Sequence, residues 1–151
     1  MSEKKLRILC VSPYTTLEPK SGGTVIFLNR SKQLYQKGHK ISFIIYKYKK
    51  DKNISETDSQ YDGKILSIIL KNKFLSFLKS FFSNKPYTYF RHMVTQKEKL
   101  QILNIIEQNK IDIVIFDETH TFPIYRILKK NLEMKNIKTS YFAHNIDYIN
   151  T

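Results

Sequence analysis

Two short stretches of the sequence carry the side chains best suited to chemistry. Asp117, Glu118 and His120 place two carboxyl groups and one imidazole within four residues. A carboxylate can orient a substrate hydroxyl or accept its proton, and an imidazole titrates near neutral pH. His144 and Asn145 add a second imidazole and an amide further along the chain. These residues are candidates for a site that moves a proton, although the first stretch could also be a solvated turn ahead of a helix.

A third stretch holds two neighbouring glycines, Gly22 and Gly23, followed by Thr24. It stands directly ahead of an expected helix, where unpaired backbone N–H groups and the helix dipole favour an anion such as a diphosphate. The stretch lacks the Gly-x-Gly-x-x-Gly pattern of dinucleotide-binding folds, and no Lys-Ser or Lys-Thr follows it as in a P-loop. It therefore predicts a diphosphate contact, with a simple tight turn as the alternative.

The composition narrows the class of protein. Cys10 is the only cysteine, so an internal disulfide is excluded and a reducing compartment such as the cytoplasm is expected. The sequence shows no metal-ligand spacing, so we expect metal-independent chemistry with no bound cofactor. It also has no run of about 18 apolar residues that could span a bilayer and no secretion signal.

Apolar runs alternate with helical periodicity along the chain. We expect helices to begin near Thr24, Thr95 and Pro123, with Thr95 and Glu98 forming a capping box and Thr121 capping the third of these helices. The apolar runs predict strands over residues 6–12, 41–46, 64–70, 111–116 and 139–143. This order predicts an α/β fold: a Rossmann-like, doubly wound parallel sheet with helices on both faces, in one domain over residues 1–151.

The expected sheet places the candidate residues together. Ligands of such sheets bind beyond the carboxyl ends of the strands, so the loops after Ser12, Phe116 and Ala143 should converge. Two other histidines, His39 and His92, are interpreted as loop or surface residues without partners.

Residues 71–93 combine aromatic and cationic side chains at helical spacing. Phe74, Phe77 and Phe81 recur on one stripe, and Lys73 and Lys79 flank it. This composition is typical of a helix that lies in a membrane interface, with Lys side chains at anionic headgroups. The alternative is a crossover helix that packs its large side chains on the sheet or on a neighbour.

Basic charge is concentrated in the first two thirds of the sequence. The formal net charge is +13, with +9 in residues 1–50 and +7 in residues 64–99. Such charge predicts an anionic partner, or else reflects compositional drift without a ligand. A non-catalytic basic module that binds nucleic acid or an anionic membrane is thus an alternative function. Nucleic acid is the weaker option, because the aromatic stripe has helical spacing rather than the alternation of a base-stacking strand.

Five motifs follow one another in a specific order: the strand at 6–12 with Pro13, Ser21-Gly22-Gly23-Thr24, Lys37-Gly38-His39-Lys40, the strand at 112–116, and His144-Asn145-Ile146-Asp147. Together they resemble the N-terminal half of family-4-type glycosyltransferases with the GT-B fold. The resemblance covers nearly the whole chain, with two departures. Asp147 stands where such proteins more often carry Glu, and the His-x-His often seen after the fourth strand is absent, leaving only His120.

The resemblance implies the acceptor-side half of a two-domain enzyme. In that family the C-terminal domain holds a nucleotide sugar, the co-substrate, and the N-terminal domain holds the acceptor. The chain is therefore expected to lack the donor-binding domain and to be inactive alone. The complete enzyme would transfer a sugar with retention of configuration, in surface polysaccharide or glycolipid synthesis, in the cytoplasm or at the inner face of the membrane.

The resemblance also implies roles for individual residues. Gly22 and Gly23 would let the backbone approach the donor diphosphate. Asp117, Glu118 and His120 would line the acceptor side as the catalytic candidates. His144 and Asn145 would adjoin them.

Overall fold

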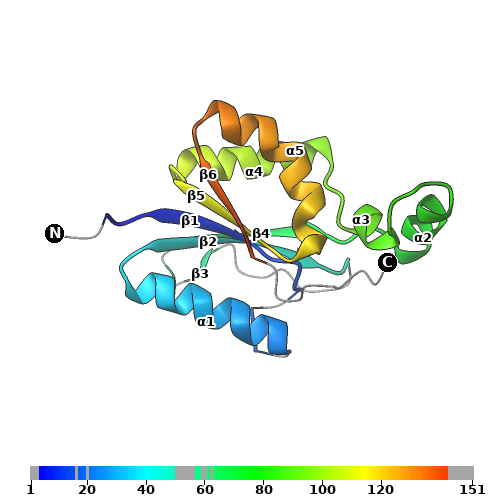
Figure 1. The fold of residues 1–151 in the computed structure, drawn as a ribbon. Coiled ribbons are helices and arrows are strands. Elements are labelled where there is room, and N and C mark those ends of the chain that lie inside the picture. The colour runs from blue at the N-terminus through cyan, green and yellow to red at the C-terminus, as the bar shows by residue number, and fades with distance from the viewer. Residues whose placement is uncertain are drawn as a thin grey trace, which may run out of the picture.

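The computed structural model describes residues 4–15, 17–19, 21–49, 57–58, 61 and 63–142. Strands and helices alternate along these residues (Figure 1). The strands are β1 (Arg7–Val11), β2 (Lys40–Lys47), β3 (Thr57–Asp58), β4 (Gly63–Ile69), β5 (Ile113–Asp117) and β6 (Lys138–Phe142). The helices are α1 (Gly22–Gln36), α2 (Lys73–Phe81), α3 (Tyr87–Arg91), α4 (Gln96–Gln108), α5 (Phe122–Met134) and the 3₁₀ turn η1 (Thr119–Thr121).

The strands form a single sheet in the order β3-β4-β2-β1-β5-β6. Strands β4, β2, β1, β5 and β6 are all parallel, and only the short β3 pairs antiparallel, with β4. The chain starts at the centre, builds outward to β4, then returns to the other side of β1 with β5 and β6. The predicted Rossmann-like, doubly wound α/β fold is confirmed, and the order of strands reverses between β1 and β5.

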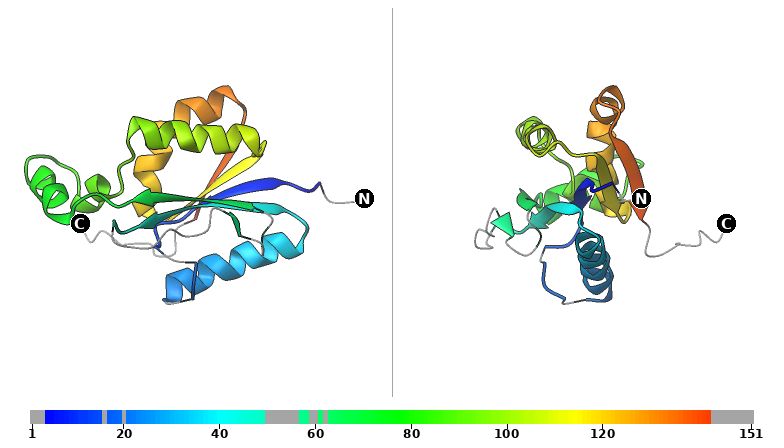
Figure 2. Two further views of the ribbon diagram at one scale, coloured as in Figure 1. Left: turned by 180° about the vertical axis from the view of Figure 1, so that it is seen from behind. Right: turned by 90° about the vertical axis from the view of Figure 1, so that its left-hand side faces the viewer.

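Helices cover both faces of the sheet. Helix α1 lies on one face, and α4 and α5 lie on the other (Figures 1 and 2). Each face has its own buried cluster, because neighbouring residues of a strand point to opposite sides. The cluster under α1 includes Ile8, Cys10, Phe27, Phe43 and Ile45. The cluster under α4 and α5 includes Leu9, Val11, Ile44, Ile102, Ile106, Val114, Ile124 and Leu128.

The first residues of α1 and α4 agree with the helix starts predicted from the sequence, whereas the first residue of α5 differs. Helix α1 begins at Gly22, close to the predicted start near Thr24, and Ser21 is its cap. Thr95 caps α4 in a capping box with Glu98, as predicted. Helix α5 begins at Phe122 rather than at Pro123, and Thr121 makes no side-chain cap. The Thr121 hydroxyl instead donates to the Glu118 carbonyl, 2.8 Å away, and so closes the 3₁₀ turn ahead of the helix. Thr121 therefore shapes the loop that follows β5.

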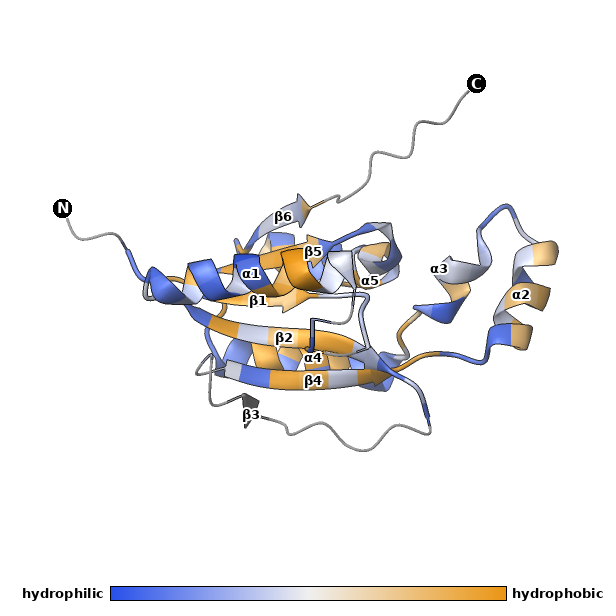
Figure 3. Ribbon diagram, turned by 90° about the horizontal axis from the view of Figure 1, so that it is seen from below, coloured by the Kyte–Doolittle hydropathy of each residue, from blue (hydrophilic) through white to orange (hydrophobic). Residues whose placement is uncertain are grey.

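Residues 71–92 leave the body of the fold and return to it. They form two helices, α2 and α3, rather than one, and Pro86 comes directly before α3. Figure 3 shows α2 standing away from the sheet with apolar residues along it. The alternative interpretation, in which this segment packs its large side chains on the sheet, is wrong: Phe74, Phe77 and Phe81 are 70%, 59% and 78% exposed.

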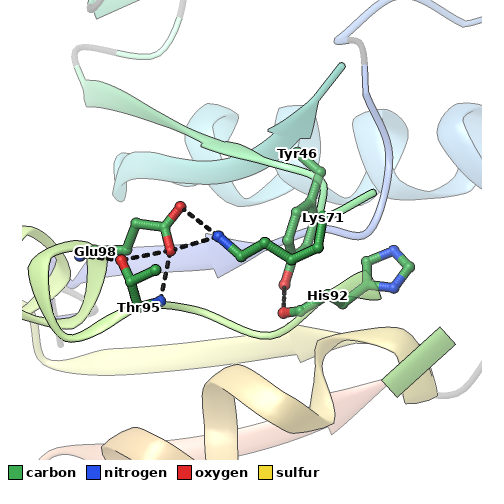
Figure 4. A network of polar contacts seen from close by, with 5 residues as sticks. All are labelled: Tyr46, Lys71, His92, Thr95 and Glu98. Atoms are coloured by element: carbon green, nitrogen blue, oxygen red, sulfur yellow. Dashed lines mark hydrogen bonds and ion pairs between the residues drawn. The ribbon is translucent and has the colours of Figure 1, made fainter. Parts of the chain in front are cut away.

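A polar network holds the base of this α2–α3 lobe (Figure 4). The Lys71 ammonium lies 3.0 Å from a carboxylate oxygen of Glu98, and the Lys71 backbone N–H donates to the Arg91 carbonyl at 3.0 Å. The Tyr46 hydroxyl, at the end of β2, donates to the His92 carbonyl at 2.8 Å. The two ends of the lobe are thus fixed to each other and to the sheet.

Candidate functional site

A cavity of about 510 Å³ lies at the carboxyl edge of the parallel sheet. Its walls come from the loops after β1, β2, β4 and β5 and from the α2–α3 lobe. Ligands of doubly wound sheets bind at this edge, where the strand order reverses. Tyr14 from the first loop and Glu118 and His120 from the loop after β5 share the cavity, so the predicted convergence of those two loops is confirmed.

Glu118 has the most constrained backbone in the site. Its φ of 60° and ψ of 164° lie in a region that residues other than glycine rarely occupy. One of its carboxylate oxygens accepts a short hydrogen bond from the Tyr14 hydroxyl, and the other lies 3.5 Å from Nδ1 of His120. Strained backbone persists where the surroundings over-determine it, and it clusters at functional sites. The surrounding structure therefore holds both the backbone and the carboxylate of Glu118 in one conformation.

Backbone contacts with β6 and β2, and a contact with the Ser12 hydroxyl, fix Glu118 and Tyr14. The Glu118 N–H donates to the carbonyl of Phe142 on β6 at 2.9 Å. The Tyr14 carbonyl accepts from the Tyr46 N–H on β2 at 3.1 Å, and the Tyr14 N–H donates to the Ser12 hydroxyl at 3.2 Å. Both side chains thus sit on the rigid ends of strands rather than on a free loop. Such placement favours a preorganised site.

The hydroxyl of Tyr14 acts as a donor. Burial and then the hydrogen bond to Glu118 raise the pKa of Tyr14. The phenol therefore stays protonated at neutral pH and keeps the Glu118 carboxylate oriented. No feature of the sequence singled out Tyr14, which follows the Pro13 turn at the end of the first strand.

His92 belongs to the site, and its interpretation as a surface residue without a partner is wrong. It is 7% exposed, its ring packs edge-on against Tyr46 at 4.7 Å, and it lies 5.2 Å from the His120 ring. Its Nδ1 lies 2.7 Å from the Thr88 carbonyl. Because a carbonyl only accepts, Nδ1 carries the proton and Nε2 is the free acceptor of the ring. His39 is also engaged: its Nδ1 accepts from the Leu6 N–H at 3.2 Å.

The burial of His92 predicts a pH-dependent stability. Burial lowers the pKa of His92 from 6.5 to about 4. Between these values the unfolded chain binds a proton at His92 and the folded chain does not, so the free energy of unfolding falls as the pH drops from 6.5 to 4. A pKa difference of one corresponds to about 1.4 kcal/mol, so about 3 kcal/mol of stability should be lost over this range.

Urea unfolding at several pH values between 7 and 4 checks this expectation. His92→Gln should remove most of the pH dependence that the wild type shows. His39→Gln, which leaves His92 in place, should unfold with the wild-type pH dependence. Equal losses in the wild type and in His92→Gln would show that His92 does not cause the effect.

Asp117 lies beside Glu118 in sequence but faces away from the cavity. Its side chain is fully buried, and Oδ1 lies 2.7 Å from Nη2 of Arg30 on α1. The Arg30 guanidinium also lies 4.3 Å from the centroid of the Phe142 ring and 5.6 Å from that of Phe27. Two further nitrogens of Arg30, Nε and Nη1, are buried without a hydrogen-bond partner in the described structure. Asp117 thus ties β5 to α1 instead of lining the site.

The glycine pair opens α1 as expected, but its two members differ. An added Cβ at Gly22 would meet nothing within 4 Å, so the helix start is open there. At Gly23 the same atom would lie 2.0 Å from the Tyr14 hydroxyl. The absence of a side chain at Gly23 therefore lets Tyr14 cross the helix start on its way to Glu118. Thr24 is buried, and its hydroxyl completes the cap of α1 by accepting from the Ser21 N–H at 2.8 Å.

The other residues predicted for the site and for membrane contact lie in different parts of the molecule, and two of them are not among the described residues. His144 and Asn145 lie outside the described residues, so the third predicted loop is not placed. Lys73 lines the cavity, whereas Phe74, Phe77, Phe81 and Lys79 lie on the exposed α2. The described residues include no group of three His, Cys, Asp or Glu side chains that could hold a metal ion. None of the described helices is long and apolar enough to cross a bilayer.

A second cavity, of about 370 Å³, lies beside β6. Phe116, Phe122, Tyr125 and Tyr141 make it largely apolar, and its described lining contains no ionisable group apart from the tyrosine hydroxyls. That described lining has no candidate acid or base, so the cavity around Glu118 and His120 is the better candidate for chemistry.

Comparisons with known proteins do not assign the chain to a family. No protein-family model matches the sequence. No curated protein matches it either.

Proposed function

We propose that the chain is the acceptor-side domain of a retaining, sugar-nucleotide-dependent glycosyltransferase of the GT-B type. The observation that carries this proposal is the strained Glu118, bonded to Tyr14 and close to His120, in a cavity at the reversal point of a Rossmann-like sheet. The sequence resemblance described above supports the same assignment. The product would be a surface polysaccharide or a glycolipid.

The transfer assigns roles to the candidate residues. The acceptor hydroxyl oxygen forms a bond to the anomeric carbon of the donor sugar on the face from which the nucleoside diphosphate departs, so the configuration is retained as the bond to the diphosphate breaks. Glu118 orients the hydroxyl and accepts its proton. His120, with its Nδ1 3.5 Å from the Glu118 carboxylate, helps to orient that carboxylate. Tyr14 holds the carboxylate in place. Asp117 is a positioning residue, because it is buried against Arg30.

The donor diphosphate has a candidate contact at the open start of α1. The backbone around Gly22 presents N–H groups at a helix N-terminus with free space in front of it. The nucleotide itself would be held by a second, donor-side domain. All five residues of β6 are exposed, so this end of the sheet leaves room for further structure beside it.

A transfer assay tests the assignment. The chain is joined to the donor-side domain and supplied with labelled uridine and guanosine diphosphate sugars and a lipid extract as the acceptor. Label should pass to the extract with the anomeric configuration retained, and the chain alone should release no nucleoside diphosphate. Turnover of a nucleotide sugar by the chain alone would contradict the proposal.

The exposed face of α2 supports a location at the membrane surface. Phe74, Phe77 and Phe81 are exposed, and Lys73 and Lys79 flank them. Aromatic side chains can enter the acyl boundary of a lipid surface while each Lys contributes about 1 kcal/mol at anionic headgroups. The site would then face an acceptor held in the inner leaflet.

Co-sedimentation with phosphatidylglycerol vesicles at low salt checks this location. The double variant Phe77→Ser/Phe81→Ser should bind at least about tenfold more weakly than the wild type, because each Phe buries apolar surface worth about 1.5–3 kcal/mol. Leu100→Ser is the matched control, since Leu100 is 65% exposed on α4. Equal binding of the double variant and the wild type, or no binding by the wild type, would contradict the location.

A further inference from the structure

Two cations on the cavity wall have no counter-charge among the described residues. Lys73, the first residue of α2, and Arg91, the last residue of α3, both line the cavity. Neither forms an ion pair with any residue that the structure describes, whereas the nearby Lys71 pairs with Glu98. The guanidinium of Arg91 lies 5.6 Å from the centroid of the Tyr48 ring, which keeps it beside the opening.

Among the described residues, the cavity offers these cations one carboxylate, and that group is already engaged. Glu118 is the only acidic residue of the described lining, and it is bonded to Tyr14 and lies beside His120. The remaining polar side chains of the lining are donors or neutral groups, including the hydroxyls of Tyr87 and Thr88. The lining therefore has an excess of positive charge and of hydrogen-bond donors.

The backbone segments that carry the two cations are joined to each other and to the sheet. The hydrogen bond from the Lys71 N–H to the Arg91 carbonyl, 3.0 Å long, joins the segment just before α2 to the end of α3. The Tyr46 hydroxyl fixes the next residue, His92, at 2.8 Å. Two cations on neighbouring backbone segments next to hydroxyl donors suit a group with several charged oxygens, and arginine binds phosphate oxygens in a forked geometry.

We propose that Lys73 and Arg91 bind a phosphate group of the acceptor substrate. This inference rests on the proposed function, because it names the class of acceptor: a phosphate ester whose hydroxyl-bearing part reaches Glu118. The phosphate could belong to a lipid or to a soluble sugar phosphate. Phe74 follows Lys73 directly and is 70% exposed, so a hydrocarbon chain on the phosphate would meet an apolar surface.

The test uses the 151-residue chain and the ring signals of its histidines in NMR spectra. Methyl phosphate and octyl phosphate, the latter below its micelle concentration, are the two probes. Each should shift the signals of His92 and His120, which line the cavity, and leave His39 unchanged. Arg91→Gln and Lys73→Gln should each weaken binding about tenfold, as expected for the loss of one charge-assisted hydrogen bond.

Lys32→Gln is the matched control, because it removes one charge from an exposed position of α1 outside the cavity. Its affinity should equal that of the wild type. The proposal is overturned if neither probe shifts His92 and His120, if His39 shifts equally, or if Arg91→Gln and Lys73→Gln bind as the wild type does.

The two probes also separate the two sources of phosphate. Tighter binding of octyl phosphate, with the gain lost in Phe74→Ser, supports a lipid phosphate, and equal binding supports a soluble one. Transfer to neutral acceptors without phosphate binding would leave the glycosyltransferase assignment intact and remove this inference alone. Phosphate binding without any sugar transfer would leave the phosphate site intact and remove the glycosyltransferase assignment.

Discussion

Glu118→Gln should lower the kcat of the proposed two-domain transferase by about 10²–10⁴-fold, the usual contribution of a positioned general base. Glutamine keeps the size of the side chain and an oxygen that can accept from Tyr14, but it cannot take a proton. His120→Gln should also lower kcat, by a smaller factor, because His120 acts on the same carboxylate from 3.5 Å away. Steady-state transfer of labelled sugar measures both effects.

Glu118→Gly separates catalysis from folding at this position. Glycine adopts a φ of 60° without strain, so relief of about 1–3 kcal/mol offsets the lost contacts of the carboxylate. The Glu118→Gly variant should therefore be at least as resistant to urea as Glu118→Gln. Its transferase activity should be as low as that of Glu118→Gln or lower. A Glu118→Gln enzyme with a kcat within about threefold of the wild type would exclude Glu118 as the base.

Asp117→Ala should cost about 3–5 kcal/mol of unfolding free energy, as measured by urea unfolding at neutral pH. The substitution removes the carboxylate that lies 2.7 Å from the Arg30 guanidinium, of which two nitrogens already lack a hydrogen-bond partner among the described residues. A buried charge without a counter-charge is far more costly than an exposed one. The loss should exceed that of any exposed ion pair, such as Lys129 with Glu133.

The double variant Arg30→Met/Asp117→Leu provides the control. Replacing both members of a buried pair with apolar side chains of similar volume is often neutral, so most of the stability should return. If Asp117→Ala unfolds within about 1 kcal/mol of the wild type, the pair does not stabilise the fold. Asp117 would then again be a candidate for direct action in the site.

Most of the fold could be predicted from local sequence, because the five parallel strands and the helices α1, α4 and α5 have their own apolar patterns or caps. The apolar runs that form β1, β2 and β5 are buried on both faces, and Ser21 and Thr95 mark helix starts through their caps. Once the elements alternate, the topology brings the ends of β1 and β5 to one edge. The location of the cavity and the place of Glu118 and His120 in it follow from that arrangement.

The other members of the site depend on contacts between distant parts of the chain. His92 is buried because the α2–α3 lobe returns to the sheet at Tyr46, which no local pattern reveals. Asp117 is the last residue of β5, and its side chain meets Arg30 on α1. Glu118 follows the strand with a φ of 60° and meets Tyr14 instead. The choice between the two carboxylates therefore required the tertiary structure.

Mapping where the acceptor binds shows directly whether the cavity around Glu118 is the acceptor site. An acceptor identified in the transfer assay is fitted with a photoreactive group, crosslinked to the protein and located by peptide sequencing. If Glu118 acts on the acceptor, we expect crosslinks to residues of the cavity around it, such as Tyr14, Tyr87 and His120. Crosslinks confined to the cavity beside β6, at Phe122, Tyr125 or Tyr141, would contradict it.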